Sequence, residues 1–166
     1  MLKRGAVARH LQACNHASHN LSFQESFCEG VFPGDAAGTY LPEFDVIVPT
    51  TPPPFHLDAA LTSLDKLISL NPTALYFSHF GRAIDAVQRL KDYKVQLQLW
   101  ADIAEDGVKK NKGLEVIRDR IIKEDKVMNQ IISYIQSHRI YSKTMLENCV
   151  RGFINYSQQK IAKTQS

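Results

Sequence analysis

Three short segments of the chain carry side chains that commonly bind metal ions. They are residues 15–19, 34–38 and 78–81, which contain His16, Asp35 and His79. Imidazole nitrogen and carboxylate oxygen bind zinc at about 2.0 to 2.2 Å, and iron and manganese accept the same donors. A carboxylate can also bridge two ions. Because each of the three residues lies beside a small or turn-forming residue, we expect each side chain to leave a strand end and face a metal.

The residues between these segments predict strands that would position them. Residues 7–14 could form a short strand leading to His16. Residues 20–33 predict a hairpin, since apolar and polar residues alternate over 21–23 and the apolar run 30–32 follows a polar break. Asp35 would then lie just past the second strand of the hairpin. Residues 74–77 predict a buried strand that ends next to His79.

The central part of the chain follows the order of an α/β protein. Residues 45–48 form a β-branched run that Pro49 ends, and the three prolines at 52–54 favour an extended surface connection. Apolar residues then repeat at three and four positions over residues 57–68, which predicts a helix ending before Asn71 and Pro72. A strand, a helix and a second strand in this order indicate an α/β fold.

From Ala83 onward the pattern predicts helices almost to the end. The first would be one long helix or two helices broken near residues 93–95, with turns at 106–107 and 112–113. Further apolar stripes run over residues 114–135 and 145–153, and Ser142 is a candidate N-cap. We expect a domain at 1–105 and a helical region at 106–166 packed on it.

Taken together, the segments resemble one family of hydrolases. Gly-Val-Phe-Pro-Gly-Asp-Ala-Ala-Gly (30–38), Pro-Thr-Thr-Pro-Pro-Pro-Phe (49–55) and Tyr-Phe-Ser-His-Phe-Gly (76–81) occur in the order seen in metallo-β-lactamase-fold proteins. The resemblance is strongest over residues 12–100. An aspartate at position 35, where the β-lactamases have cysteine, is similar to the glyoxalase II and phosphodiesterase branches.

The resemblance implies a site with two divalent ions, most often zinc, with iron or manganese as alternatives. His16 would bind one ion, His79 the other, and Asp35 would bridge them. A metal-bound hydroxide would attack an ester, thioester or phosphodiester of a small-molecule substrate. His19 could orient the ligand or the substrate, or it could face solvent. His10, His56 and His138 lack such context.

The chain also departs from the family pattern. It contains no His-x-His-x-Asp-His segment, and Ala13, Cys14 and Asn15 replace the usual Thr-Pro-Gly before the first histidine. Three ligands are too few for two ions. We therefore expect the C-terminal half of a metallo-β-lactamase-like αββα sandwich followed by a helical appendage, inactive by itself. The chain would be truncated, degraded or completed by a second chain, which could be another copy of itself.

Composition leaves two other classes open. With 166 residues and a net charge of +3, the chain predicts an ordinary single globular core. Its three scattered cysteines and the absence of a long apolar run favour a cytoplasmic location with no membrane span. A non-catalytic interaction or oligomerisation module with a vestigial metal site is the main alternative. Nucleic-acid binding is disfavoured, because acidic residues alternate with the basic ones over residues 109–126.

Overall fold

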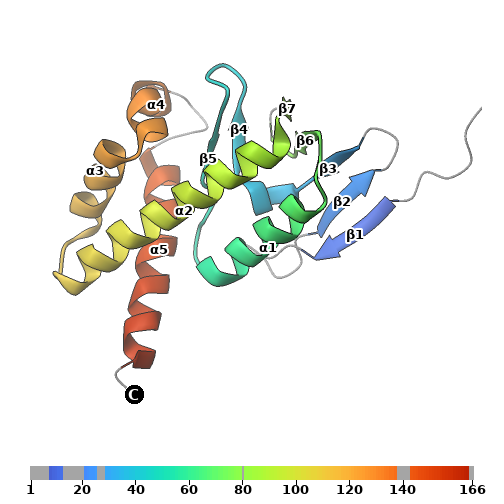
Figure 1. Cartoon of the computed structure of the whole chain (residues 1–166). Coiled ribbons are helices and arrows are strands. Elements are labelled where there is room, and N and C mark those ends of the chain that lie inside the picture. The colour runs from blue at the N-terminus through green and yellow to red at the C-terminus, as the bar shows by residue number, and fades with distance from the viewer. Residues whose placement is uncertain (1–7, 13–20, 26–28, 80, 138–142, 165–166) are drawn as a thin grey trace, which may run out of the picture.

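The larger of two β-sheets contains both of the strands that precede Asp35 and His79. The structure, a computed structural model, describes residues 8–12, 21–25, 29–79, 81–137 and 143–164. The sheet has the order β1-β2-β3-β6-β7 (Figure 1). Its strands are β1 (Ala8–Gln12), β2 (Leu21–Glu25), β3 (Gly30–Phe32), β6 (Ala74–Phe77) and β7 (Gly81–Ile84). Only β3 and β6 pair in parallel among these described strands.

A second sheet of two strands lies next to the first. It pairs β4 (Thr39–Leu41) with β5 (Val46–Val48) in an antiparallel hairpin. Asp45, at φ 55°, ends the connecting turn and accepts a hydrogen bond from the Tyr40 hydroxyl at 2.5 Å. Arg89 Nη2 lies 2.8 Å from the same carboxylate. These contacts attach the hairpin to the helix that carries Arg89.

Two helices pack against the sheets. They are α1 (Leu57–Ser69) and α2 (Ala86–Lys109), which lie side by side in Figure 1. Val31 and Leu75 of the large sheet are fully buried and belong to the same apolar cluster as Leu64 of α1 and Leu90 of α2. One face of the large sheet therefore contributes to the core of the protein.

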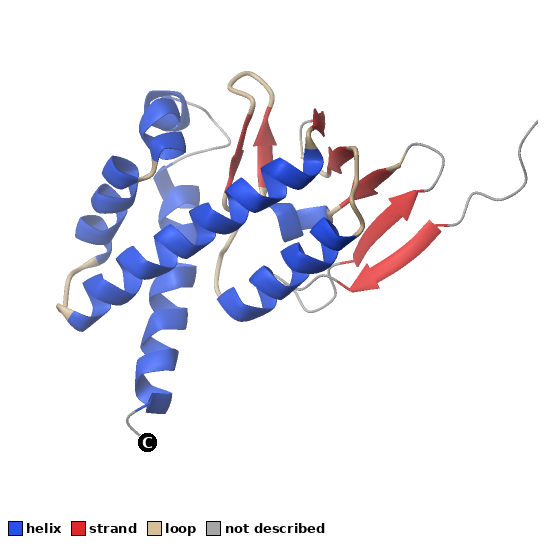
Figure 2. Cartoon of the chain, viewed as in Figure 1, coloured by secondary structure: helices blue, strands red, loops and turns tan. Residues whose placement is uncertain are grey.

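Three further helices complete the core at the other end of α2. They are α3 (Leu114–Glu124), α4 (Lys126–Ser137) and α5 (Lys143–Thr164). Figure 2 shows strands gathered at one end of the molecule and these helices at the other, with α2 extending between them. The Phe153 ring of α5 lies 5.7 Å from Trp100 of α2 and 4.6 Å from Phe55, measured between centroids.

The sequence predictions for the first half are largely confirmed. Strands form within residues 7–14, 45–48 and 74–77, a hairpin forms within residues 20–33, and the helix predicted over 57–68 is α1. Two short strands were not predicted. One is β4, and the other is β7, where we expected helix from Ala83 onward. Pairing with β6 forms β7, and the helix begins only at Ala86.

The helical predictions need two corrections. Of the two alternatives expected after Ala83, the single long helix is confirmed, since residues 93–95 lie inside an unbroken α2. Asp106 and Gly107, which we expected in a turn, also lie inside this helix. The stripe over 114–135 is two helices, because Asp125 has extended backbone and separates α3 from α4. The proposed N-cap Ser142 lies outside the described residues. The division expected at residue 105 falls within α2 and stays a prediction.

One contact between α1 and α5 gives a testable pH dependence. The Tyr156 hydroxyl donates to Asp58 Oδ2 at 2.8 Å, and burial together with this hydrogen bond raises the pKa of Tyr156 to about 12. Because the neutral phenol is favoured in the folded state, its contribution to stability is complete below the ordinary tyrosine pKa of 10.0. This contribution is lost as the pH rises through about 12. Two pKa units correspond to about 2.7 kcal/mol, and solvent screening of the partly exposed hydroxyl reduces this to about 1 kcal/mol. Urea unfolding between pH 10 and 12 should therefore show that Tyr156→Phe loses about 1 kcal/mol less stability than the unmodified chain. Equal losses would contradict a role for Tyr156.

Candidate metal site

Asp35 and His79 are brought together by the parallel pairing of β3 with β6. The register joins Gly30 to Ala74 and Val31 to Leu75, residues that are 44 positions apart in the sequence. Asp35 and His79 have the same separation, and each lies just beyond the carboxyl end of its strand. Since the carboxyl ends of parallel strands lie at one edge of a sheet, the two side chains meet there.

The geometry of this pair suits a shared metal ion. His79 Nε2 lies 3.7 Å from Asp35 Oδ1. Two donors placed about 2.1 Å from one tetrahedral ion are about 3.4 Å apart, so a small adjustment would let both bind it. The side chains are 56% and 35% exposed for His79 and Asp35, respectively, which leaves the pair open to solvent and to additional ligands.

A tight turn holds Asp35 in place. Asp35 belongs to the short 3₁₀ helix η1 (Gly34–Ala37), which Gly38 ends by donating its N–H to the Asp35 carbonyl at 3.1 Å. Gly38 has φ 72°, and a Cβ there would lie 2.5 Å from the Val48 carbonyl oxygen and 2.9 Å from the Tyr93 hydroxyl. Glycine is therefore required at 38 both for the left-handed backbone and for the close packing.

Two supporting residues were not predicted from the sequence. Ser22 of β2 is fully buried and donates to the Pro33 carbonyl at 3.0 Å, which connects β2 to the start of the Asp35 turn. Tyr93 of α2 packs behind Gly38, and burial raises the pKa of Tyr93, so its phenol is neutral. The only sequence signal was a polar residue in an alternating strand for Ser22, and an aromatic residue at a core position for Tyr93.

Two further residues of the predicted site are the ligand His16 and the possible supporting residue His19. His16 and His19 lie outside the described residues, so their roles stay predictions. Among the residues that the structure describes, no group of three or more histidine, cysteine, aspartate or glutamate side chains could hold a metal ion. Of the three predicted ligands, the structure therefore brings together two. His56 is exposed and occupies the position before α1.

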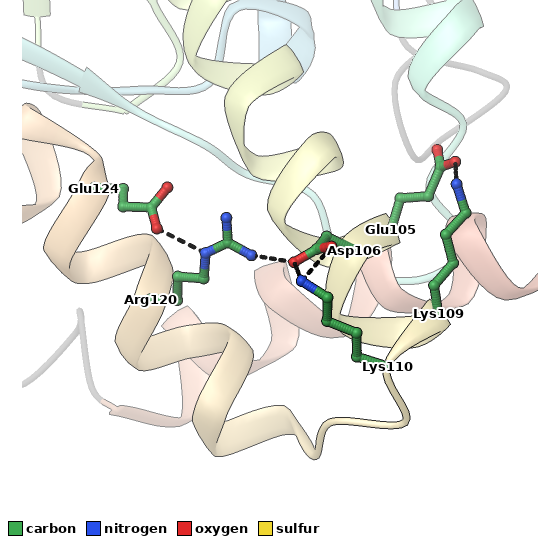
Figure 3. A network of polar contacts seen from close by, with 6 residues as sticks. All are labelled: Glu105, Asp106, Lys109, Lys110, Arg120 and Glu124. Carbon is green, nitrogen blue, oxygen red and sulfur yellow. Dashed lines mark hydrogen bonds and ion pairs between the residues drawn. The ribbon is translucent and has the colours of Figure 1, made fainter.

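The basic stretch after residue 105 consists largely of cations that contact acids of the same chain. Lys109 lies 2.7 Å from Glu105, and Lys110 lies 2.9 Å from Asp106, which Arg120 also contacts (Figure 3). Arg120 additionally contacts Glu124, and Arg118 contacts Asp119 and Glu147. Two of these ion pairs connect α3 to α2 and to α5, and together the pairs reduce the positive charge offered to a nucleic acid.

Comparison with known proteins identifies the class of fold. No family model and no curated protein sequence matches the chain. Solved structures do match, and the following two are among them. A metallo-β-lactamase superfamily protein from Sulfolobus tokodaii is 20% identical, with a TM-score of 0.55 over 91% of this chain and 47% of its own. A metallo-β-lactamase family protein from Thermus thermophilus is 18% identical, with a TM-score of 0.64 over 95% of this chain and 46% of its own.

The fold is thus that of metallo-β-lactamase superfamily proteins, and the chain spans about half the length of these solved structures. The mixed α/β architecture and the helical C-terminal region agree with the fold class expected from the sequence. Within the described residues, no helix combines the length and apolar character needed to cross a membrane.

Proposed function

We propose that this chain supplies part of the divalent-metal site of a metallo-β-lactamase-type hydrolase. The observation that carries the proposal is the placement of Asp35 Oδ1 and His79 Nε2 3.7 Å apart at the carboxyl ends of two parallel strands. Both residues have the donor chemistry that zinc, iron or manganese accepts. Zinc is the ion we expect first.

The roles of the residues follow from their chemistry. Asp35 has two carboxylate oxygens and could contact two ions, while His79 offers a single imidazole nitrogen. In this proposal His16 is a further ligand and His19 supports a ligand or the substrate. A bound pair of such ions lowers the pKa of a coordinated water and polarises a carbonyl or phosphoryl oxygen. The corresponding substrates are small esters, thioesters or phosphodiesters, as in the glyoxalase II-like branch.

The number of donors also indicates that this chain does not form the complete metal site by itself. A catalytic zinc ion normally has three protein ligands, so a pair of ions needs more donors than His16, Asp35 and His79 provide. We therefore infer that the isolated chain is inactive, and that the complete site, with two ions, includes donors from other polypeptide. We place the complete protein in the cytoplasm, which suits its scattered cysteines.

A second candidate function is a non-catalytic interaction module with a vestigial metal site. The observation that favours it is the limited number of donors, since the described residues hold only the Asp35 and His79 pair near the predicted site. The two candidates differ in whether this pair still contributes to metal binding.

Metal affinity separates these candidates. We expect the purified chain to bind zinc, and Asp35→Asn and His79→Gln each to weaken binding at least about 10-fold, because each removes one ligand. Competition with a chromophoric zinc chelator gives the dissociation constants, and elemental mass spectrometry after dialysis gives the stoichiometry. His56→Gln is the matched control, since it removes an exposed histidine outside the pair. If all three variants bind zinc as tightly as the unmodified chain, the ligand assignment is wrong.

A further inference from the structure

The face of the large sheet opposite the core carries a row of aromatic side chains, of which Phe23 and Phe32 are exposed and Tyr76 is half-buried. Phe23 pairs with Phe32 across β2 and β3, and Tyr76 pairs with Arg82 across β6 and β7. The Phe32 and Tyr76 rings stack with their centroids 4.8 Å apart, which joins the two pairs into one line across four strands. We call Phe23, Phe32, Tyr76 and Arg82 the aromatic row.

The aromatic row is unusually exposed for such large side chains. Phe23 is 37% and Phe32 42% exposed, while Val31 and Leu75, which point to the opposite face, are 0% exposed. Ile84, two residues from Arg82 on the same face of β7, is 54% exposed. Phe23, Phe32 and Ile84 are three of the five large apolar side chains that are exposed among the described residues. Apolar surface concentrated in this way marks an interface.

The aromatic row is also next to the candidate metal site. Phe32 precedes Asp35 by three residues and Tyr76 precedes His79 by three, so the two donors lie at the end of the strands that form the middle of the row. A polypeptide that covers the row therefore also lies beside the incomplete site.

We propose that the aromatic row is the interface on which a second copy of this chain packs, face to face, to complete the metal site. This proposal rests on the proposed function. One copy corresponds to 46% to 47% of the length of the two solved structures, so two copies provide about the chain length of one such protein. A second copy also brings a second Asp35 and a second His79.

Charge selects the arrangement of the two copies. A two-fold axis parallel to the strands, between β3 and β6, reverses the row, so that Tyr76 faces Phe32 of the second copy. Arg82 then faces the Phe23 ring of the second copy, a cation–aromatic contact of the kind it already makes with Tyr76 at 5.9 Å. An axis perpendicular to the strands would instead place the two Arg82 side chains opposite each other, and like charges would oppose it.

The favoured axis also keeps the strand directions of both copies the same. The carboxyl ends of β3 and β6 in the two copies therefore lie at the same edge of the paired sheets. Sheets that pack face to face are about 10 Å apart. The arrangement thus places two Asp35 and His79 pairs across this gap, which gives four donors around a common axis.

Sedimentation analysis of the purified chain tests the interface. We expect a mass of twice 18.8 kDa at about 100 μM chain, a concentration that reveals even a micromolar dimer. Phe32→Lys and Tyr76→Glu should each weaken the dimer at least about 100-fold, because each buries an unpaired charge in the middle of the row. Val116→Lys is the control, since Val116 is 54% exposed and lies on α3, away from the sheet (Figure 1). Circular dichroism verifies that each variant is folded.

An equimolar mixture of the two variants tests the axis. In the arrangement we propose, lysine at 32 of one chain faces glutamate at 76 of the other, so the mixture should recover a dimer that neither variant forms alone. A chain that remains monomeric, a dimer that Phe32→Lys does not weaken, or a mixture that stays monomeric would overturn the proposal. Metal content is measured on the same samples: a dimer of this kind without metal would refute the proposed function and leave the interface intact.

Discussion

Replacing Gly152 with alanine is expected to destabilise the protein by about 3 kcal/mol or more, since the new methyl group has no space. A Cβ at this position in α5 would lie 1.8 Å from the carbonyl oxygen of Thr51 and 3.1 Å from Phe55 Cβ. The obstructing atom belongs to the backbone, so no change of rotamer can relieve the overlap. A loss of this size is a large fraction of the stability of an ordinary domain.

The contacts around Gly152 explain why α5 cannot simply shift away. Thr51 Oγ1 donates to the Cys149 carbonyl at 3.2 Å, and Cys149 Sγ donates to the Pro49 carbonyl at 3.3 Å. The Phe55 and Phe153 rings pack on the same side, 4.6 Å apart. Moving α5 outward to admit a methyl group would break these buried contacts together.

Urea unfolding followed by circular dichroism measures this effect. Gly113→Ala is the matched control, because a Cβ there meets no atom within 4 Å and the backbone has φ −73°, which alanine adopts freely. We expect the control to change the free energy of unfolding by less than about 1 kcal/mol. Similar losses in the two variants would show that the close contact of α5 with residue 51 does not limit stability.

Asp125→Ala is expected to cost about 3 to 4 kcal/mol, because it leaves several buried donors without an acceptor. Asp125 is only 3% exposed. Its Oδ2 accepts from Trp100 Nε1 at 2.6 Å and from Gln96 Nε2 at 2.7 Å. Its Oδ1 accepts from the backbone N–H groups of Val127 at 2.8 Å and Met128 at 3.3 Å, which caps the start of α4.

The fluorescence of Trp100, the single tryptophan of the chain, reports directly on this network during urea unfolding. Asp119→Ala is the control, since the Asp119 side chain is 64% exposed where it pairs with Arg118, and we expect a loss below about 1 kcal/mol. A double-mutant cycle with Trp100→Phe, followed by circular dichroism because these variants lack the tryptophan, should show that part of the cost of Asp125→Ala disappears when the indole N–H is absent. Strict additivity would mean that the indole hydrogen bond contributes nothing.

Local sequence patterns predicted the helices and strands whose conformation depends mainly on their own side chains. The hairpin within residues 20–33 and helix α1 follow from alternation and from three-and-four spacing. Strand β7 was missed because Gly81 and Arg82 have no apolar period, and Ala83 and Ile84 resemble the start of the helix that follows. The break between α3 and α4 was missed because Asp125 resembles an exposed acid until Trp100 and Gln96 are placed around it.

The site depended on information that local patterns do not contain. Asp35 and His79 were selected by resemblance to a family of known hydrolases. Their contact follows from the parallel pairing of β3 with β6, and the sequence does not reveal which strands are neighbours. The supporting contact from Ser22 depends on the same sheet order. The sequence therefore predicted the chemistry of the donors, whereas the structure was needed to show their arrangement.

Helix α2 has a consequence for dividing this chain into smaller units. Near its start, Tyr93 packs behind the turn that holds Asp35, and two turns later Trp100 contacts Asp125 and Phe153. The single continuous helix α2 thus supports the sheet edge that carries Asp35 and His79, and it also forms the centre of the helical end of the protein. We expect a shortened chain that ends after α2 to be less stable at the Asp35 turn as well as at the helical end. Changes to α3, α4 or α5 would therefore affect the candidate metal site although they replace none of its residues.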